Sequence, residues 1–177
     1  MRVTATPIAG AHLIDPEPIV DERGFFARLW SQTAFADQGL AEDFVQCNSA
    51  FNVGRATLRG LHYQVAPHQE VKLVRCVHGA IFDVLVDLRP DSPTHLRWFG
   101  TELTARNRTM LYVPQGCAHG YVTLEDASEV FYLVSHPYHP EAERGARWDD
   151  PLFAIQWPIV DGLTISAKDR SWPDYRP

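Results

Sequence analysis

The sequence has little cysteine: three residues in 177, with no two of them forming a C-x-x-C pair. An odd and sparse set of this kind argues against a disulfide framework and favours a reducing compartment. We expect Cys47, Cys76 and Cys117 to be small, buried apolar side chains.

The sequence also lacks a long apolar run and an excess of basic charge. No run approaches the roughly 20 residues of a membrane-spanning helix, and residues 1–7 lack the apolar core of a signal peptide. We therefore expect a cytoplasmic protein. Sixteen lysines and arginines face 22 acidic residues, which gives a net charge of -6. That balance disfavours binding to nucleic acid or to an anionic membrane, but a local Arg/Lys cluster could still hold an anionic ligand.

The apolar residues that are present, 45% of the chain, are sufficient for one domain with a real core. They fall into short β-rich runs punctuated by glycine and proline, without long helical periods between them. This pattern is typical of an all-β sandwich or closed barrel and argues against a parallel α/β fold. The predicted strands are 25–30, 44–51, 58–64, 71–77, 81–88, 98–103, 109–113, 120–124 and 129–134. One short helix is predicted at 31–38, with Ser31 as its N-cap.

The composition of the sequence changes after residue 136, where repeated prolines interrupt regular structure and three tryptophans offer large apolar area. We expect this segment to wrap over the barrel or a neighbouring subunit. The predicted organisation is a single domain, 1–177, with an N-terminal arm at 1–48, a barrel core at 49–136 and a wrapping segment at 137–177.

Strand alternation gives a first view of the charged residues. Lys72 shares a face with Val74 and Cys76. It is therefore either a lysine at the edge of the sheet whose aliphatic stem covers apolar surface, or a charged residue that points inward and has a function. Taken alone, the edge interpretation is favoured. Asp83 and Asp87 lie opposite an apolar face of their strand and either face solvent or pair with Lys72 or a histidine.

His62 is a candidate base, because an imidazole can accept a proton at neutral pH when a carboxylate orients its other nitrogen. Arg59 would point away from His62 unless Gly60 marks a bulge. Tyr132 is either a half-buried core tyrosine or an acid facing His62 across a ligand. A lone strand histidine is usually structural, but the company of Arg59, Lys72 and His119 in the same central block favours chemistry.

A metal site is the alternative use of the same block. His62, Glu70 and His119 could bind iron as two histidines and a carboxylate. The second position after His62 is Gln64, a poor ligand for soft or borderline metals, which makes a metal site the less favoured interpretation.

Eight motifs occur in one order along nearly the whole chain. They are DERGFF at 21–26, QCN at 46–48, LRGLHYQ at 58–64, KLVR at 72–75, DVLVDLR at 83–89, PQGCAHG at 114–120, WDDP at 148–151 and SAKD at 166–169. By these motifs the chain resembles the dTDP-4-dehydrorhamnose 3,5-epimerase family.

The resemblance implies a cupin-type jelly-roll barrel with short peripheral helices and an irregular C-terminal tail, acting without metal or cofactor. The implied reaction is epimerisation at C3 and C5 of dTDP-4-dehydro-6-deoxy-D-glucose, giving dTDP-4-dehydro-L-rhamnose. His62 would remove the proton alpha to the C4 ketone, and Asp169 would orient His62. Tyr132 would be the opposing acid, and Lys72 would hold the C4 oxygen as negative charge develops.

The resemblance also implies the residues that bind the substrate and the assembly of the protein. The implied binding residues are Arg23, Phe26, Gln46, Asn48, Arg59, Lys72, His119, Tyr138, Glu143 and Lys168, with Tyr138 stacking on the base. Family members are homodimers whose N-terminal segment reaches the partner's site, so residues 1–48 are expected to be exchanged and Arg23 to serve the other subunit.

Two departures and three alternatives accompany this resemblance. Arg28 stands where the family often has a glutamate that contacts the base, and the loop at 49–57 differs from that of the best-known rhamnose enzymes. Both bear on the nucleotide and the sugar. The alternatives are a 3-epimerase acting on a related nucleotide 4-keto-6-deoxyhexose, a metal-dependent cupin, and a sugar-nucleotide binder without turnover.

Overall fold

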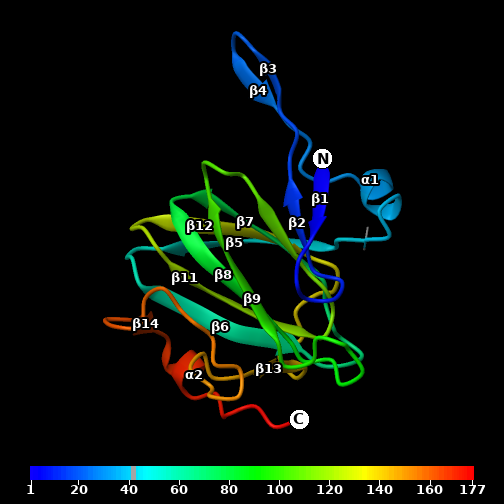
Figure 1. Ribbon diagram of the computed structural model, residues 1–177. Helices are drawn as coiled ribbons and strands as arrows, with labels where there is room; N and C mark the ends of the chain where they lie inside the picture. The colour runs from blue at the N-terminus through cyan, green and yellow to red at the C-terminus, as the bar shows by residue number, and fades with distance from the viewer. Residues whose placement is uncertain (41–42) are drawn as a thin grey trace.

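The computed structural model describes residues 1–40 and 43–177, and two packed antiparallel sheets form its body (Figure 1). The first sheet has the order β1 (Arg2–Ala5), β2 (His12–Asp15), β10 (Met110–Val113), β7 (Lys72–His78), β12 (Ser128–Val134) and β5 (Gln46–Asn52). The second has the order β13 (Glu143–Gly145), β6 (Thr57–Gln64), β11 (Cys117–Thr123), β8 (Ala80–Asp87) and β9 (Trp98–Thr104). A short strand, β14 (Thr164–Ile165), runs parallel to β6. The all-β jelly-roll prediction is confirmed.

The predicted strands of the central block match the observed ones to within a few residues, whereas the N-terminal region differs. A hairpin of β3 (Ile19–Asp21) and β4 (Gly24–Phe26) ends where the predicted strand 25–30 was to continue. Strands β1 and β2 were not predicted, and neither was the helix α2 (Ala167–Arg170). Helix α1 (Gln32–Ala36) begins after Ser31 as predicted, but the Ser31 hydroxyl hydrogen-bonds with Thr33 Oγ1 and makes no capping bond.

Two buried layers explain why both faces of β8 are apolar or paired. One layer lies between the sheets and includes Val74, Cys76 and Leu85. The other packs Val84 and Val86 beneath Phe153, Trp157 and other side chains of the C-terminal segment. Because that segment covers the apolar face of β8, the opposite face is the barrel interior and not a solvated surface.

This packing corrects two predictions. Asp83 and Asp87 are fully buried, so the solvent-facing interpretation was wrong for both. Cys76 and Cys117 are buried as predicted, whereas Cys47 is exposed on the edge strand β5.

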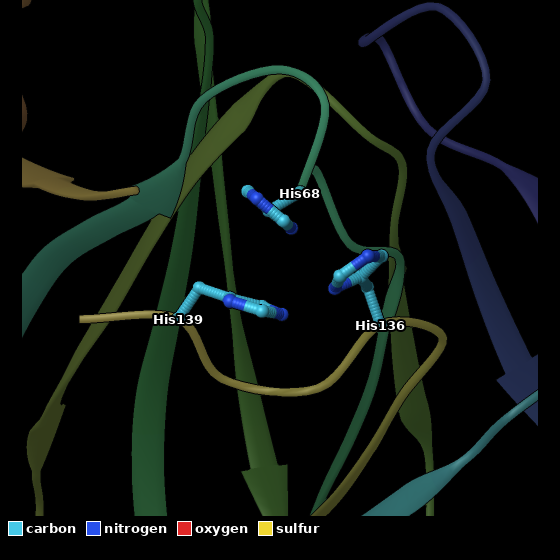
Figure 2. Close-up of side chains that lie close together, drawn as sticks. All are labelled: His68, His136 and His139. Carbon is cyan, nitrogen blue, oxygen red and sulfur yellow. The ribbon is translucent and has the colours of Figure 1, made fainter. Parts of the chain in front are cut away.

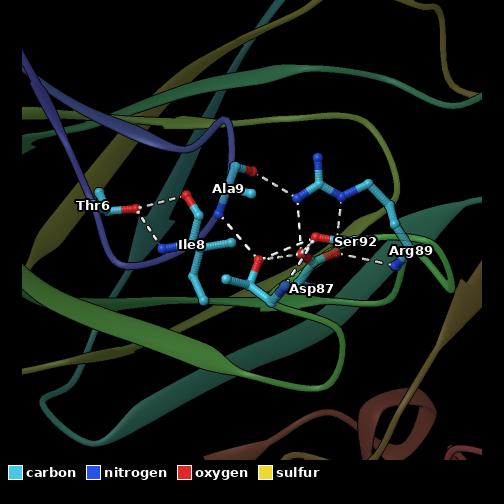
Figure 3. Close-up of polar contacts among 7 residues, drawn as sticks. Thr6, Ile8, Ala9, Asp87, Arg89 and Ser92 are labelled. Carbon is cyan, nitrogen blue, oxygen red and sulfur yellow. Dashed lines mark hydrogen bonds and ion pairs between the residues drawn. The ribbon is translucent and has the colours of Figure 1, made fainter.

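Asp87 joins the barrel to its N-terminal strands (Figure 3). Its carboxylate accepts hydrogen bonds from Arg89 Nε at 2.8 Å, Ser92 Oγ at 2.5 Å and Thr94 Oγ1 at 2.6 Å, and Arg89 donates onward to the Ala9 carbonyl at 2.6 Å. Burial alone raises the pKa of Asp87, but these hydrogen bonds outweigh it and hold the pKa far below its ordinary value. The network fixes the end of β8, the strand that also carries Asp83.

The β3–β4 hairpin projects away from the two sheets at one end of the molecule (Figure 1). It carries exposed apolar side chains, including Val20 and Phe26. None of the helices within 1–40 and 43–177 is long and apolar enough to cross a membrane.

Candidate active site

Strands of both sheets place His62, Lys72 and Tyr132 around two adjoining cavities. One, called the main cavity because Gln46, Asn48, Tyr138 and Glu143 also line it, has a volume of about 290 Å³. The second has about 160 Å³, and all three side chains line both. His62 comes from β6, Lys72 begins β7 and Tyr132 lies in β12. β7 and β12 are paired in the first sheet, with Val134 opposite Lys72, while β6 belongs to the second sheet. Side chains from both sheets therefore meet at these cavities inside the barrel.

A buried carboxylate holds the His62 ring. His62 Nε2 lies 2.7 Å from Asp169 Oδ1, and the second Asp169 oxygen accepts the Gly60 N–H at 3.2 Å. Burial raises the pKa of Asp169, but His62 and the Gly60 amide lower it on balance, so the carboxylate stays ionised. An ionised carboxylate can only accept, which assigns the proton to Nε2 and leaves Nδ1 as the basic nitrogen.

The local sequence of α2 and β6 explains this contact. The Ser166 hydroxyl accepts the Asp169 N–H at 3.0 Å, so the N-cap of α2 fixes the backbone from which Asp169 reaches β6. Gly60 has φ +124, and a Cβ there would stand 2.6 Å from Gly120 Cα of the neighbouring strand. Only glycine permits this backbone and this close approach.

Gly60 also marks the predicted bulge. On β11, His119 pairs with His62 and Tyr121 pairs with Arg59, so β6 carries one more residue than β11 over this stretch. The extra residue turns Arg59 toward the same second cavity that His62 lines. Asn52 Oδ1 accepts from Arg59 Nε at 2.8 Å and keeps the guanidinium in place.

Lys72 is an inward charge with a partner, so the edge interpretation of this residue was wrong. Its side chain is 12% exposed, and its Nζ lies 3.3 Å from Glu70 Oε1. Tyr132 faces the same cavities, and burial, opposed by Arg59 and reinforced by Glu70, raises its pKa. The phenol therefore keeps its proton at neutral pH and can donate it.

A second histidine–carboxylate pair lies next to the first. His119 Nε2 lies 2.8 Å from Asp83 Oδ1. Asp83 therefore has a histidine partner, which was one of the alternatives that the sequence left open. The His119 side chain is 10% exposed and lines the second cavity, whereas that of His62 is 32% exposed and lines both. A ligand in the main cavity therefore meets His62 first.

The other binding residues implied by the resemblance divide into three groups. Gln46, Asn48, Tyr138 and Glu143 line the main cavity. Glu143 accepts from Tyr138 Oη at 2.6 Å and pairs with Lys168 Nζ at 2.5 Å, which brings Lys168 to the rim. Arg23 and Phe26 lie on the β3–β4 hairpin and line neither cavity of their own chain. The Arg23 side chain is 82% exposed and makes an ion pair with Asp21. Arg28 is exposed as well.

The sequence did not predict the roles that two residues of the site have in the structure. Glu70 was considered as a metal ligand, and the structure makes it the partner of Lys72. Gln64 was considered as the absence of a ligand, yet its amide donates to the His68 carbonyl and to Glu70 and accepts the His139 N–H. The spacing of Glu70 and Lys72, two residues apart with Glu70 just before β7, was the available signal.

The metal-site alternative for His62, Glu70 and His119 is not supported by their surroundings. Each histidine is held by its own aspartate, and Glu70 is engaged by Lys72 and Gln64. Within the described ranges, these three residues do not bring their ligand atoms together as a metal-binding group.

Comparison with known proteins agrees with this architecture along the whole chain. A family model described as dTDP-4-dehydrorhamnose 3,5-epimerase matches residues 5–176. The enzyme of that name from Methanothermobacter thermautotrophicus is 45% identical, over 99% of this chain and 95% of the relative.

Two crystal structures are also similar. One is a dTDP-6-deoxy-D-glucose-3,5-epimerase from Legionella pneumophila in complex with dTDP-4-keto-L-rhamnose. It has a TM-score of 0.92 and 34% identity, over 98% of this chain and 92% of that chain. The other is a 3′-monoepimerase from Streptomyces bikiniensis in complex with dTDP-quinovose. It has a TM-score of 0.86 and 31% identity, over 96% of this chain and 85% of that chain.

The fold and these relatives define the class of protein: an isomerase of the sugar-nucleotide epimerase type, built on a jelly-roll barrel. Within that class, the chain belongs to the dTDP-4-dehydrorhamnose 3,5-epimerase family.

Proposed function

We propose that this protein converts dTDP-4-dehydro-6-deoxy-D-glucose to dTDP-4-dehydro-L-rhamnose by inverting C3 and C5. The observation that carries the proposal is that four groups meet around one cavity. They are the His62 imidazole with the Asp169 carboxylate behind it, the Lys72 ammonium and the neutral Tyr132 phenol. Removal and return of a proton next to a ketone needs a base, a positive charge for the enolate oxygen and an acid on the far face.

His62 is the proposed base. Its Nδ1 takes the proton from C3 or C5, and the imidazolium that forms is stabilised by Asp169 at 2.7 Å. The C–H bonding electrons move into the enolate, whose C4 oxygen becomes negative. The proton on His62 is then lost to solvent before the next cycle, so the reaction changes no oxidation state.

Lys72 and Tyr132 complete the proposed cycle. The Lys72 ammonium stabilises the C4 oxygen, and Glu70 fixes that ammonium in place. Tyr132 donates its proton to the face of the carbon opposite His62, which inverts the centre, and solvent then reprotonates it. Arg59, His119, Gln46 and Asn48 are the proposed contacts to the rest of the substrate.

Solvent exchange tests the proposal directly. In deuterated buffer the enzyme should place deuterium at C3 and C5 of dTDP-4-dehydro-6-deoxy-D-glucose, read by NMR. His62→Ala should abolish exchange at both carbons. Tight binding of the nucleotide sugar without any exchange would contradict the proposal. Exchange restricted to C3 would instead select the monoepimerase reaction, which one of the similar structures is named for.

The projecting hairpin supports a second part of the proposal, that the chain works as a homodimer and residues 1–48 reach the partner's site. Arg23 and Phe26 are exposed and remote from their own cavities, and the exposed side chains of Ile19 and Val20 accompany them. An isolated two-stranded hairpin is marginally stable in water, so apolar side chains at this density favour a covered position.

Mixing two inactive variants tests the exchange of the arm. If Arg23 serves the partner's cavity, a dimer of one Arg23→Ala chain and one His62→Ala chain has one intact site. Statistical reassortment of the two variants should then restore about a quarter of the wild-type sites. No recovery, with heterodimers verified by mass, would show that Arg23 acts within its own subunit, and full activity of Arg23→Ala alone would show that Arg23 serves neither site.

A further inference from the structure

Three histidines outside the proposed catalytic group converge on one point (Figure 2). His68 lies between β6 and β7, and His136 and His139 lie between β12 and β13. Each ring offers one nitrogen such that the three nitrogens all lie within 4.8 Å of one another. The His68 and His139 rings are stacked with centroids 3.8 Å apart, and the His136 centroid lies 5.0 Å from that of His68.

A buried glutamine holds the two segments together. Gln64 is 5% exposed, its Nε2 donates to the His68 carbonyl at 2.9 Å, and its Oε1 accepts the His139 N–H at 2.6 Å. One side chain thus fixes the backbone of two of the three histidines from opposite directions. A buried side chain therefore determines the relative position of the two segments that carry the histidines.

The cluster also offers a nitrogen that is free to bind a ligand. His68 Nδ1 is buried and has no hydrogen-bond partner among the residues described. The carboxylate of Glu141 is close enough to interact electrostatically with His68 and adds a negative charge beside the cluster.

We infer that His68, His136 and His139 form a binding site for a divalent transition-metal cation of the zinc type. Three imidazoles suit Zn²⁺, Cu²⁺ or Ni²⁺ and are poor ligands for Mg²⁺ or Ca²⁺. Nitrogens around a tetrahedral zinc ion lie about 3.4 Å apart, given bonds of about 2.0–2.1 Å. The separations in the structure extend to within 4.8 Å, so binding requires the three side chains to rotate toward the ion.

The site has a definite place relative to the main cavity. His136 lines that cavity and Tyr138, two residues later, lines it as well. A cation on the three histidines would tie the segment before β13 to the β6–β7 loop and keep a fourth coordination position for water. The inference concerns binding and does not rest on the proposed reaction.

Zinc titration of protein without a polyhistidine tag tests the site. Calorimetry should give one Zn²⁺ per chain with micromolar Kd, and Co²⁺ should give the visible absorption of a tetrahedral complex. At a zinc concentration of 100 times Kd, Tm should rise by about 5–10 °C. His68→Gln and His139→Gln should each weaken binding at least tenfold, while their Tm without metal shows that they fold.

Two further variants locate the bound ion. His78→Gln, a change of an exposed histidine elsewhere, should leave zinc affinity unaltered. His62→Gln removes an imidazole from the proposed catalytic group and should also leave it unaltered. The inference is overturned if no stoichiometric binding occurs, if His68→Gln and His139→Gln bind zinc like the wild type, or if His62→Gln abolishes binding.

Discussion

Replacing Asp169 by asparagine removes one charge at the contact on which the proposed base depends. Asp169 Oδ1 accepts the His62 Nε2–H at 2.7 Å, and this carboxylate is buried. Asparagine has nearly the same shape, and its oxygen can still accept the Gly60 N–H. The variant is therefore expected to fold, and its defect should be confined to His62.

Two losses set the size of the effect. A charge-assisted hydrogen bond contributes about 1.5–3 kcal/mol, which corresponds to about 10–150-fold in rate. Asparagine can also turn its NH2 group toward Nε2, which then accepts and places the proton on Nδ1. An imidazole in that tautomer cannot take a proton from the substrate, and the equivalent error in serine-protease triads costs about 10⁴-fold. We expect kcat to fall by about 10²–10⁴-fold.

Solvent deuterium exchange and nucleotide binding together measure this prediction. Exchange at C3 should slow by the same factor as kcat, the affinity for dTDP should stay within error, and the pH dependence of kcat should change. Asp149→Asn, at an exposed aspartate paired with Arg147, is the matched control and should leave exchange unchanged. If Asp169→Asn kept kcat within about threefold of wild type, Asp169 would not be a positioning residue for His62.

Three further predictions concern the other groups. Tyr132→Phe should retain part of the exchange while impairing inversion at C5, because His62 can still remove protons; loss of all exchange would refute the assignment of Tyr132 as the acid. Lys72→Met should lower kcat by about 10²–10³-fold with little change in dTDP affinity, since the enolate loses its charge partner; a purely larger KM would assign Lys72 to binding. Asp87→Asn should cost about 3–5 kcal/mol and lower Tm by about 10 °C, because it removes the charge of the fully buried Asp87 and leaves the half-buried Arg89 without its anion. The folded pKa of Asp87 is depressed, so its contribution is present above its unfolded pKa of about 3.9 and is lost as the pH falls through the folded value. Tm measured against pH should therefore fall more steeply in acid for wild type than for Asp87→Asn.

The residues of the proposed catalytic group could be selected from sequence motifs, but the surroundings and hydrogen-bond partners of each residue could not. Alternation placed Lys72 with Val74 and Cys76, yet its inward direction followed from packing, since β7 contributes to the layer between the sheets. For the same reason the apolar face of β8 was read correctly, whereas the sequence left open whether Asp83 and Asp87 face solvent or a buried partner. The cover over that face comes from Phe153 and Trp157, nearly 70 residues later in the chain.

The N-terminal strands could not be predicted from the sequence at all. Strands β1 and β2 are short; β1 pairs with β2, and β2 pairs with β10 across nearly a hundred residues of sequence. No local pattern encodes a partner at that separation. The three histidines beside the main cavity were likewise invisible, because His68 and His139 are brought together by Gln64 through the fold.

The sequence by itself determined the alternating strands and the motif order of the epimerase family, because these depend on the order of residues along the chain. Tertiary structure decided which nitrogen of His62 is basic, which carboxylate faces which cation and where the histidine cluster lies. Those properties depend on contacts such as His62 with Asp169, 107 positions apart, and they exist only once the sheets have packed.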